Sequence, residues 1–323
     1  MEIRPYTAAD DPHLMAIEQR SARGFPQPFV HFRRRFIDRA ELYSNHCTLV
    51  AEDRGQIIGV TSIIVKDTLI GNSRTKIAYS FDTRVAPEYR RQGVGHALVE
   101  EKLKWARDKG AVGVYSLIVT TNQASMGMVQ KSGYQKIRII LYAQFQPYPL
   151  IIPPQYEPHC RKNPKTDEPL LHTFDGRDLY VPHVAQRVQH LDFQRWTLDD
   201  DSGNHAGLSV YNQSKIYLKI PAEAPWPQTE SDVERLGRNL QIFDVIGLEH
   251  PALLKDLFDW VRDDAVTNNV NKLTWLIDRN ETLPAFIFDD MSYQTDYWLM
   301  YKPFEDTDQP TWEGLVYLDP RDI

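Results

Sequence analysis

The clearest periodic signal in the chain lies between Val94 and Arg107, where apolar and polar positions fall on opposite sides of a helical wheel. The apolar side consists of Val94, Leu98, Val99, Leu103, Trp105 and Ala106. The preceding stretch, Lys76–Val85, is rich in apolar and aromatic residues and predicts a strand. An amphipathic helix directly after such a strand predicts a helix that packs on a sheet.

The rest of the first 146 residues alternates between strand and helix patterns in the same way. It predicts, in order, a strand at Glu2–Pro5, a helix through about Arg20, a loop and second helix within Gly24–Leu42, a hairpin of CTLVAE and QIIGVTSIIV, the strand and helix already described, a strand at Gly110–Val119, a helix from Asn122 to Gly133, and a final strand at Gln135–Phe145. This β-α-α-β-β-β-α-β-α-β order predicts a mixed α/β fold with helices on both faces of a central sheet.

A proline-rich stretch divides the chain. Gln146 to Pro169 holds a third of the 21 prolines, which predicts a stiff and extended linker. With 323 residues the chain is long enough for two domains. The sequence therefore predicts a first domain at residues 1–146, a linker at 147–169 and a second domain at 170–323.

The second domain reads as a diverged copy of the first. LVEEKLKWARD, which begins at Leu98, has a counterpart in LLKDLFDWVRD, which begins at Leu253, and YQKIRIILYAQF has a counterpart in YQTDYWLMYKPF. Asn122 and Asn280 fall between these two pairs at a matching spacing. A chance likeness of two helices is the alternative, but the ordered spacing favours a duplicated domain.

The start of the Val94–Arg107 helix predicts an anion-binding site. Gly93 and Gly95 lie there, so a ligand can approach the backbone with no Cβ in its way. The first N–H groups of a helix lack intrahelical partners and lie at the positive end of its dipole. Arg90 and Arg91 add positive charge. Such a corner suits a phosphate group.

Several phosphate-binding motifs can be compared with this stretch. A Walker loop requires GxxxxGK followed by Ser or Thr, and a dinucleotide fingerprint requires a third glycine or an alanine where this chain has Leu98. A plain strand-to-helix turn is a further alternative. The stretch resembles the RxxGxG signature of the GNAT superfamily of N-acetyltransferases, carried here by Arg90, Gly93 and Gly95. The resemblance implies a GNAT-type central sheet in two tandem copies and acetyl-CoA as co-substrate.

The resemblance also implies which residues contact the CoA. Strand residues before the loop would pair with the pantetheine arm, the loop would bind the pyrophosphate, and an asparagine after the next strand would touch the CoA. In this sequence these residues are Thr83, Arg84, Val85, Arg90, Arg91, Gln92, Gly93, Val94, Gly95, His96 and Asn122. For Asn122, a simple helix cap is an equally good interpretation.

The resemblance implies a general base on the strand before the loop, at Tyr79 or Phe81. Strand alternation places Tyr79, Phe81 and Thr83 on one face and Asp82 on the other, unless a bulge intervenes. Tyr79, acting through water, is therefore the predicted base, and Asp82 is the second candidate. A purely structural role is the alternative for both residues.

The proton donor has a weaker signal. The tyrosine that often protonates the CoA thiolate in this family is replaced here by Val129. Ser125 or water would have to serve as the acid.

The segment between Phe25 and Phe36 would cover the acceptor pocket in this family. Arg33, Arg34 or Arg35 could therefore hold a carboxylate of the acceptor. A solvated helix face is the alternative interpretation of these three charges.

The copy of the phosphate loop in the second domain differs from the original. Leu248 and His250 fall where the first domain has Gly93 and Gly95, and no basic residue replaces the two arginines. We therefore expect the second domain to bind no CoA.

Composition narrows the remaining classes of function. The net charge of −7 gives no support to a nucleic-acid or anionic-membrane partner, and no apolar run approaches the ~20 residues of a membrane span. The N-terminus is charged and does not resemble a secretory signal, and two cysteines cannot form a disulfide framework, so we expect a cytoplasmic protein. The scattered histidines predict no metal site.

Two functions remain open from the sequence. The first is an acetyl-CoA-dependent N-acetyltransferase that acts on the amine of a small molecule, amino acid or peptide, as a monomer or a homodimer. The second is a non-catalytic acyl-CoA-binding sensor or scaffold, which Val129 and the missing carboxylate base favour. The intact loop favours the enzyme.

Overall fold

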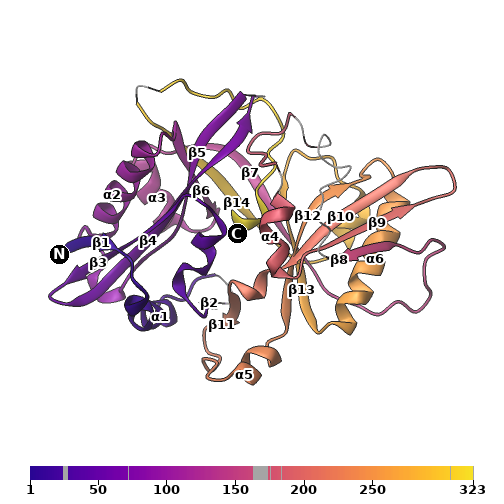
Figure 1. Ribbon diagram of the computed structural model, residues 1–323, viewed down its shortest axis with the longest axis horizontal. Coiled ribbons are helices and arrows are strands. Elements are labelled where there is room, and N and C mark those ends of the chain that lie inside the picture. Colours follow the sequence, from indigo (N-terminus) through magenta and orange to yellow (C-terminus); the bar gives the residue numbers. More distant parts are fainter. Residues whose placement is uncertain are drawn as a thin grey trace.

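The computed structural model describes residues 1–24, 28–71, 73–162, 174, 176–182, 184–305 and 307–322. Its main feature is one sheet of twelve strands in the order β1-β3-β4-β5-β6-β14-β7-β13-β12-β10-β9-β8. The first half of the chain, residues 1–146, forms one end of the molecule, the second half forms the other, and the last described residues lie between them (Figure 1). This confirms the predicted mixed α/β fold with a large central sheet.

The first half follows the predicted order of elements closely. Its strands are β1 (Glu2–Pro5), β2 (Phe29–Phe32), β3 (His46–Asp53), β4 (Gln56–Ile70), β5 (Ser73–Val85), β6 (Gly113–Val119) and β7 (Gln135–Phe145). Its helices are α1 (Asp11–Gln19), α2 (Val94–Asp108) and α3 (Gln123–Lys131), with the short 3-10 helices η1 (Ala8–Asp10), η2 (Phe36–Leu42) and η3 (Pro87–Tyr89). The apolar face of α2 packs on the sheet through the buried residues Leu98, Leu103 and Ala106.

The second half repeats this arrangement. Its strands are β8 (His159–Lys162), β9 (Gln194–Asp199), β10 (His205–Asn212), β11 (Leu218–Pro221), β12 (Arg238–Ile246), β13 (Val270–Asp278) and β14 (Met291–Pro303). Its helices are α4 (Val184–Val188), α5 (Glu230–Arg235), α6 (Pro251–Thr267) and α7 (Ala285–Asp289), with η4 (Gln189–Leu191), η5 (Gln213–Lys215) and η6 (Pro320–Asp322). Strand β8 lies within the stretch predicted as a linker, whose last residues, 163–169, are outside the described part of the chain.

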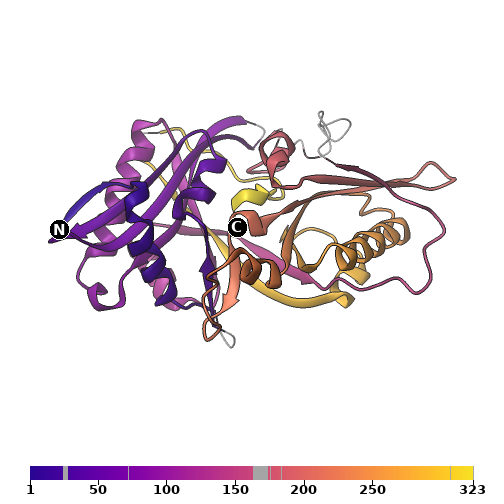
Figure 2. The same cartoon turned by 60° about the horizontal axis from the view of Figure 1, so that its bottom comes forward.

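The two halves exchange strands at the centre of the sheet. Strand β14 lies antiparallel between β6 and β7, with Tyr301 opposite Tyr115 on one side and Thr295 opposite Tyr142 on the other. Strand β7 in turn pairs with β13, where Leu276 lies opposite Tyr142. The last strand of each half therefore lies among strands of the other half, and both cross the middle of the molecule in Figures 1 and 2.

A smaller contact between the halves corrects the prediction for Gly24–Leu42. Instead of a loop and a second α-helix, this segment forms the strand β2 and the 3-10 helix η2. Strand β2 pairs with β11 of the second half, so that His31 lies opposite Lys219. The prediction failed because the partner strand is distant in sequence, and local patterns carry no record of it. Phe25 and Pro26 lie outside the described residues.

The duplication is also visible in the backbone. The ladder between β4 and β5 shifts register at Asp82, whose φ is 51°, and the ladder between β10 and β12 shifts at Asp244, whose φ is 50°. A positive φ is uncommon outside glycine, and a bulge of this kind re-aims the side chains around it. The connection from bulge to helix is shorter in the second half, because α6 follows its N-cap His250 whereas α2 follows its N-cap Gly93.

Candidate active site

Strands β5 and β6 lie parallel in the first half and pair over only a short stretch. Ala78 pairs with Val114 and Tyr79 with Tyr115, and the parallel pairing of these described strands ends there. The rest of β5, up to Val85, therefore presents an edge toward β6 without a partner strand. Such an edge can bind an extended ligand through main-chain hydrogen bonds. Thr83, Arg84 and Val85, the predicted pantetheine-binding residues, lie on this edge.

The bulge at Asp82 decides which side chains face which side of the sheet. Arg39 stacks over the rings of Phe81 and Tyr79, 4.6 Å and 5.7 Å from their centres, and its Nη1 lies 3.7 Å from Asp82. Thr83 points the other way, because Nζ of Lys102 in α2 donates to its hydroxyl at 3.0 Å. The bulge thus places Asp82 on the same face as Tyr79, which simple alternation does not.

The loop before α2 forms the expected corner. Gly93 is the N-cap of α2 with a φ of 85°, and Arg91 has a φ of 62°. Among the described residues, the backbone N–H groups from Arg91 to His96 find no hydrogen-bond acceptor. These N–H groups lie at the positive end of the helix dipole, which is the arrangement that binds phosphate in other proteins.

The arginines of this loop differ from each other. The guanidinium of Arg90 donates to the backbone oxygen of Val85 at 3.1 Å and to the hydroxyl of Ser21 at 3.2 Å, and Arg91 is exposed. A Cβ added to Gly95 would meet Val85 at 3.6 Å and the sulfur of Met128 at 4.0 Å, which are ordinary contacts. Packing within the chain therefore does not require a glycine at position 95, whereas a ligand that approaches the backbone does.

Helix α3 lies beside the first turn of α2, as the contact of Met128 with position 95 shows. The side chain of Asn122 caps α3 by accepting from the N–H of Ser125 at 3.1 Å, so the helix-cap interpretation of Asn122 holds. Ser125 is half-buried in the first turn, and Val129 faces the core. No tyrosine of α3 is available as a proton donor, because this helix contains none.

Tyr79 is buried and both contacts of its hydroxyl are within the protein. The hydroxyl accepts from Nη2 of Arg39 at 3.0 Å and donates to the backbone oxygen of Asp322 in η6. Burial, with the nearby carboxylates of Asp322 and Asp82, raises the pKa of Tyr79 above its usual value, although Arg39 acts in the opposite direction. The phenol therefore stays protonated at neutral pH.

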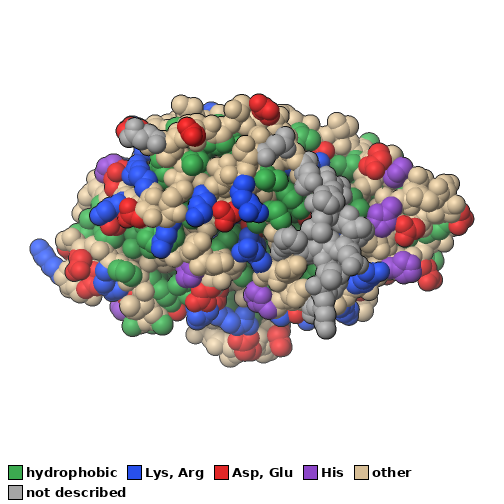
Figure 3. Space-filling view, turned by 45° about the horizontal axis from the view of Figure 1, so that its top comes forward, with side chains coloured by type: hydrophobic (Ala, Val, Ile, Leu, Met, Phe, Trp, Pro, Cys, Tyr) green, Lys and Arg blue, Asp and Glu red, His purple; other side chains and the backbone are tan. Residues whose placement is uncertain are grey.

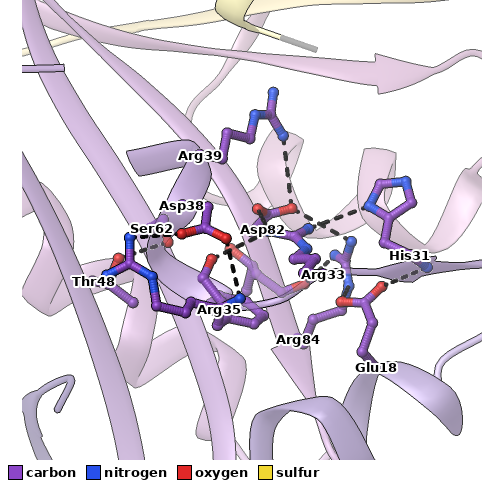
Figure 4. A network of polar contacts seen from close by, with 12 residues as sticks. Glu18, His31, Arg33, Arg35, Asp38, Arg39, Thr48, Ser62, Asp82 and Arg84 are labelled. Atoms are coloured by element: carbon purple, nitrogen blue, oxygen red, sulfur yellow. Dashed lines mark hydrogen bonds and ion pairs between the residues drawn. The ribbon is translucent and has the colours of Figure 1, made fainter. Parts of the chain in front are cut away.

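Asp82 lies at the centre of a buried network of charged side chains (Figure 4). Its carboxylate accepts from Nη1 of Arg33 at 2.6 Å and lies 3.7 Å from both Arg39 and Arg84. Burial acts to raise the pKa of Asp82, but Arg33 and Arg39 outweigh this effect and hold the pKa below its usual value. Asp82 is therefore ionised and is a weaker base than an exposed aspartate.

Sequence patterns did not single out most of this network. Arg33 is buried against Asp82, whereas its neighbours Arg34 and Arg35 are exposed and pair with Glu230 and Glu41. The three arginines look alike in the sequence, and only the pairing of β2 with β11 turns Arg33 inward. Glu18, His31, Arg39 and Lys102 were missed for the same reason, because a charged residue within an apolar pattern does not reveal its partner.

The surface charge and the remaining side chains indicate no further kind of site. Acidic and basic side chains are mixed over the described part of the face drawn in Figure 3. Among the described residues, no group of three or more His, Cys, Asp or Glu side chains is placed to hold a metal ion. None of the described helices has the length and apolar character needed to cross a membrane.

Known proteins resemble the first half in sequence. Residues 13–134 match the model of the "Acetyltransferase (GNAT) family". N-acetyltransferase family 8 member 3 of Rattus norvegicus is 32% identical over 108 residues, which cover 33% of this chain and 46% of the relative. The [ribosomal protein bS18]-alanine N-acetyltransferase of Salmonella typhimurium is 25% identical over 133 residues, which cover 41% of this chain and 80% of the relative. The match thus spans less than half the length of the first of these relatives.

Solved structures resemble the whole chain in fold. A tandem GNAT protein from the clavulanic acid biosynthesis pathway has a TM-score of 0.59 at 13% identity, covering 95% of this chain and 99% of that one. A GCN5-related N-acetyltransferase from Sphaerobacter thermophilus has a TM-score of 0.59 at 16% identity, covering 94% and 95%. The fold is therefore that of proteins with two acetyltransferase-like halves on one sheet. Residues 13–134 therefore match a GNAT acetyltransferase domain in sequence, and the whole chain has the fold of the solved tandem GNAT protein.

Proposed function

We propose that the protein is an N-acetyltransferase that transfers an acetyl group from acetyl-CoA to the amine of a small molecule, amino acid or peptide. The observation that carries this proposal is the corner at the start of α2, where unpaired N–H groups surround an accessible Gly95 next to the unpartnered edge of β5. This combination suits a donor with a phosphate group and an extended arm. The family match supports the same conclusion.

Different residues of this corner would bind different parts of the acetyl-CoA. The N–H groups from Gln92 to His96 would hold the pyrophosphate, and Arg90 and Arg91 would supply positive charge. The main chain of Thr83–Val85 would pair with the pantetheine arm. Asn122 would contact the CoA from the start of α3 while it caps that helix.

Bound acetyl-CoA supplies the activated acetyl group. The amine nitrogen attacks the thioester carbonyl, a C–N bond forms, the C–S bond breaks, and the products are an N-acetyl amine and the CoA thiol. The amine must lose one proton and the thiolate must gain one. Placing the two reactants together can lower the barrier by on the order of 7 kcal/mol.

We assign the proton transfers to groups around the bulge. Tyr79 cannot accept a proton while its hydroxyl is protonated, so it would orient a water molecule or Arg39. The ionised Asp82 is the group on this face that can accept a proton through water. Ser125 in α3, or water, would protonate the thiolate.

Release of free thiol from acetyl-CoA, measured against a panel of amines, tests the function. We expect one class of amine to give thiol release well above the rate without an amine, and calorimetry to show acetyl-CoA binding. Binding without thiol release for any amine would favour the sensor, whose structural support is that Val129 faces the core. Absence of acetyl-CoA binding would refute the acetyltransferase, and absence of binding to other acyl-CoA thioesters as well would refute the sensor.

A further inference from the structure

Basic side chains outnumber carboxylates on the face of the sheet to which Asp82 points. We call five of them the basic cluster: Arg33, Arg39 and Arg84 from the first half, and Lys219 and Lys272 from the second. Two carboxylates, Asp82 and Glu18, form ion pairs with arginines of this cluster (Figure 4).

Each of the two carboxylates is shared between several arginines. Asp82 lies 2.6 Å from Arg33, and 3.7 Å from each of Arg39 and Arg84. Glu18 lies 3.6 Å from Arg84 and also pairs with Arg23. Four arginines therefore meet two carboxylates, and most of these groups are buried.

The second half adds two lysines to the cluster without adding a carboxylate, and burial lowers the pKa of both, that of Lys219 to about 7. Lys219 lies opposite His31 in the β2–β11 ladder, and its Nζ is 3.4 Å from the hydroxyl of Tyr142. Among the described residues, neither Lys219 nor Lys272 forms an ion pair with a carboxylate. Burial, followed by Arg33, Lys219 and the other cations of the cluster, lowers the pKa of His31 well below its usual value, so this histidine is neutral.

A neighbouring network shows what a balanced arrangement looks like. Between the halves, Lys66 and Arg321 pair with Asp319 and Asp322, so two cations meet two carboxylates. Among the described residues, that network meets the basic cluster through Arg39, which donates to the backbone oxygen of Arg321 at 3.5 Å. It therefore leaves the surplus charge of the basic cluster uncompensated.

The cluster also contains buried polar atoms with no hydrogen-bond partner in the described chain. In the cluster these are Nε of Arg33 and Nε of Arg84, and beside it they are Nε2 of His31 and Oε2 of Glu18; Arg33 and His31 are 3% and 6% exposed. A buried polar atom without a hydrogen-bond partner is unfavourable unless water or a ligand supplies one, and cations in excess of carboxylates add to this cost. The arrangement therefore points to a bound anion.

The location of the cluster indicates which reactant carries that anion. Asp82 points toward the cluster, whereas the next residue, Thr83, points toward Lys102 and α2. The proposed donor site begins at the N-terminus of α2, so the cluster lies on the opposite face of the bulge. The face of the sheet with the basic cluster is therefore the one on which the acceptor can bind.

We infer that the acceptor amine bears a carboxylate group, as an amino acid does, and that Arg33 and Lys219 bind this carboxylate. The inference rests on the proposed function and names its substrate class. Arg33 offers a planar guanidinium suited to a carboxylate, and Lys219 brings the second half of the chain into the acceptor site.

Matched acids and amides provide the test. Amino acids and their amides are titrated in the presence of CoA, so that binding is measured without turnover, and the same pairs are then compared in the thiol-release assay. We expect at least one acid to bind about 10-fold or more tightly than its amide, because a charged hydrogen bond is lost in the amide.

Arg33→Gln should weaken binding of that acid by about 10- to 100-fold and leave binding of the amide nearly unchanged. Arg33→Lys, which keeps the charge, should lie between wild type and Arg33→Gln. Lys219→Gln, at a half-buried position, tests the same site without removing a partner of Asp82. Arg34→Gln is the matched control, because Arg34 is exposed and pairs with Glu230.

Three results would overturn the inference. Equal affinity for acids and amides would show that the protein does not recognise a carboxylate on the acceptor. Failure of every acid to bind would show the same. A preference for succinyl-CoA over acetyl-CoA that Arg33→Gln abolishes would move the carboxylate to the acyl group. Loss of the proposed function is distinguishable, because it would appear in the acetyl-CoA titration of the unaltered protein, whereas these results concern the acceptor alone.

Discussion

The two halves of the molecule share a framework but differ in what lies between their parallel strands. In the second half, the gap beyond the paired part of β12 and β13 is lined by the chain's own residues Val316 and Tyr317. The N–H of Val316 donates to Asp278 at 2.8 Å, and the hydroxyl of Tyr317 donates to Asp244 at the bulge. The corresponding edge in the first half is the one we assign to the donor. The duplicated gap thus serves internal packing in one half and, in our proposal, ligand binding in the other.

The two halves also differ at the start of the helix and in the side chains of the strand before it. The helix α2 begins after Gly93, whereas α6 begins after His250 and has Pro251 as its first residue. The shared bulge places Gln241 where the first half has Tyr79, and Gln241 bonds to Thr274 of β13 at 2.8 Å. The second half has therefore kept the side chains that pack the fold and not those that form the proposed site.

The largest expected effect comes from separating the halves. A fragment of residues 1–146 lacks β14, so the strands β6 and β7 lose the partner between them and expose apolar edges. We expect this fragment to be insoluble or unfolded by circular dichroism. Co-expression with residues 147–323 should restore a soluble complex. A soluble fragment that binds acetyl-CoA would contradict the role given to strand exchange.

The next effect compares the two helix starts. Gly95→Glu should abolish acetyl-CoA binding in calorimetry, because the carboxylate places bulk and negative charge among the N–H groups that would hold the pyrophosphate. The fold should persist, since position 95 meets only ordinary contacts. His250→Glu, at the start of α6, should leave both the affinity and a stoichiometry of one CoA per chain unchanged. Undiminished binding by Gly95→Glu would show that the corner is not the donor site.

A smaller effect is expected from the strand side chain that the second half has replaced. Tyr79→Phe should lower kcat/KM on the order of 10²-fold and change the pH–rate profile, because Arg39 and any water near Asp82 lose a hydroxyl partner. Tyr115→Phe is the control, because its hydroxyl also donates to Asp322 but does not contact Arg39. An identical pH–rate profile in both variants would reduce Tyr79 to a structural residue.

The sequence predicted the elements of the fold better than their connections. The amphipathic period around Leu98 and the β-branched strands reflect local packing, so the predicted order of the first half holds apart from β2. The exchange of β7 and β14 could not be predicted, because both strands carry apolar patterns that fit either neighbour. Pairings of this kind depend on the whole chain.

The candidate site divides in the same way. The corner at Gly93 and Gly95, to which we assign anion binding, could be predicted because its geometry is contained in one contiguous motif. The basic cluster was not, because Arg33 and Lys219 come together only through the β2–β11 ladder. The bulge at Asp82 was foreseen only as an exception to alternation, since no residue type requires it there.

The smallest expected effect concerns a buried lysine that the second half replaces with a leucine. Lys102 is 1% exposed, and its Nζ donates to the hydroxyls of Thr61 and Thr83 at 2.8 and 3.0 Å. The aligned position in α6 is Leu257. Burial lowers the pKa of Lys102 to about 7, although Asp82 acts in the opposite direction.

The lowered pKa of Lys102 determines how the free energy of unfolding changes with pH, and Leu257 of α6 makes no such contribution. Between pH 7 and the ordinary lysine pKa of about 10.4, the unfolded chain binds more protons at this position than the folded chain, so the free energy of unfolding rises with pH by up to about 1.4 kcal/mol per unit. Below pH 7 Lys102 contributes no slope. Lys102→Leu should remove this rise in urea unfolding at pH 7, 8 and 9, whereas Lys104→Leu, on the exposed face of α2, should retain it. The same slope in Lys102→Leu as in the unaltered protein would mean that the lysine is charged in the folded chain and that the two helix positions do not differ in this respect.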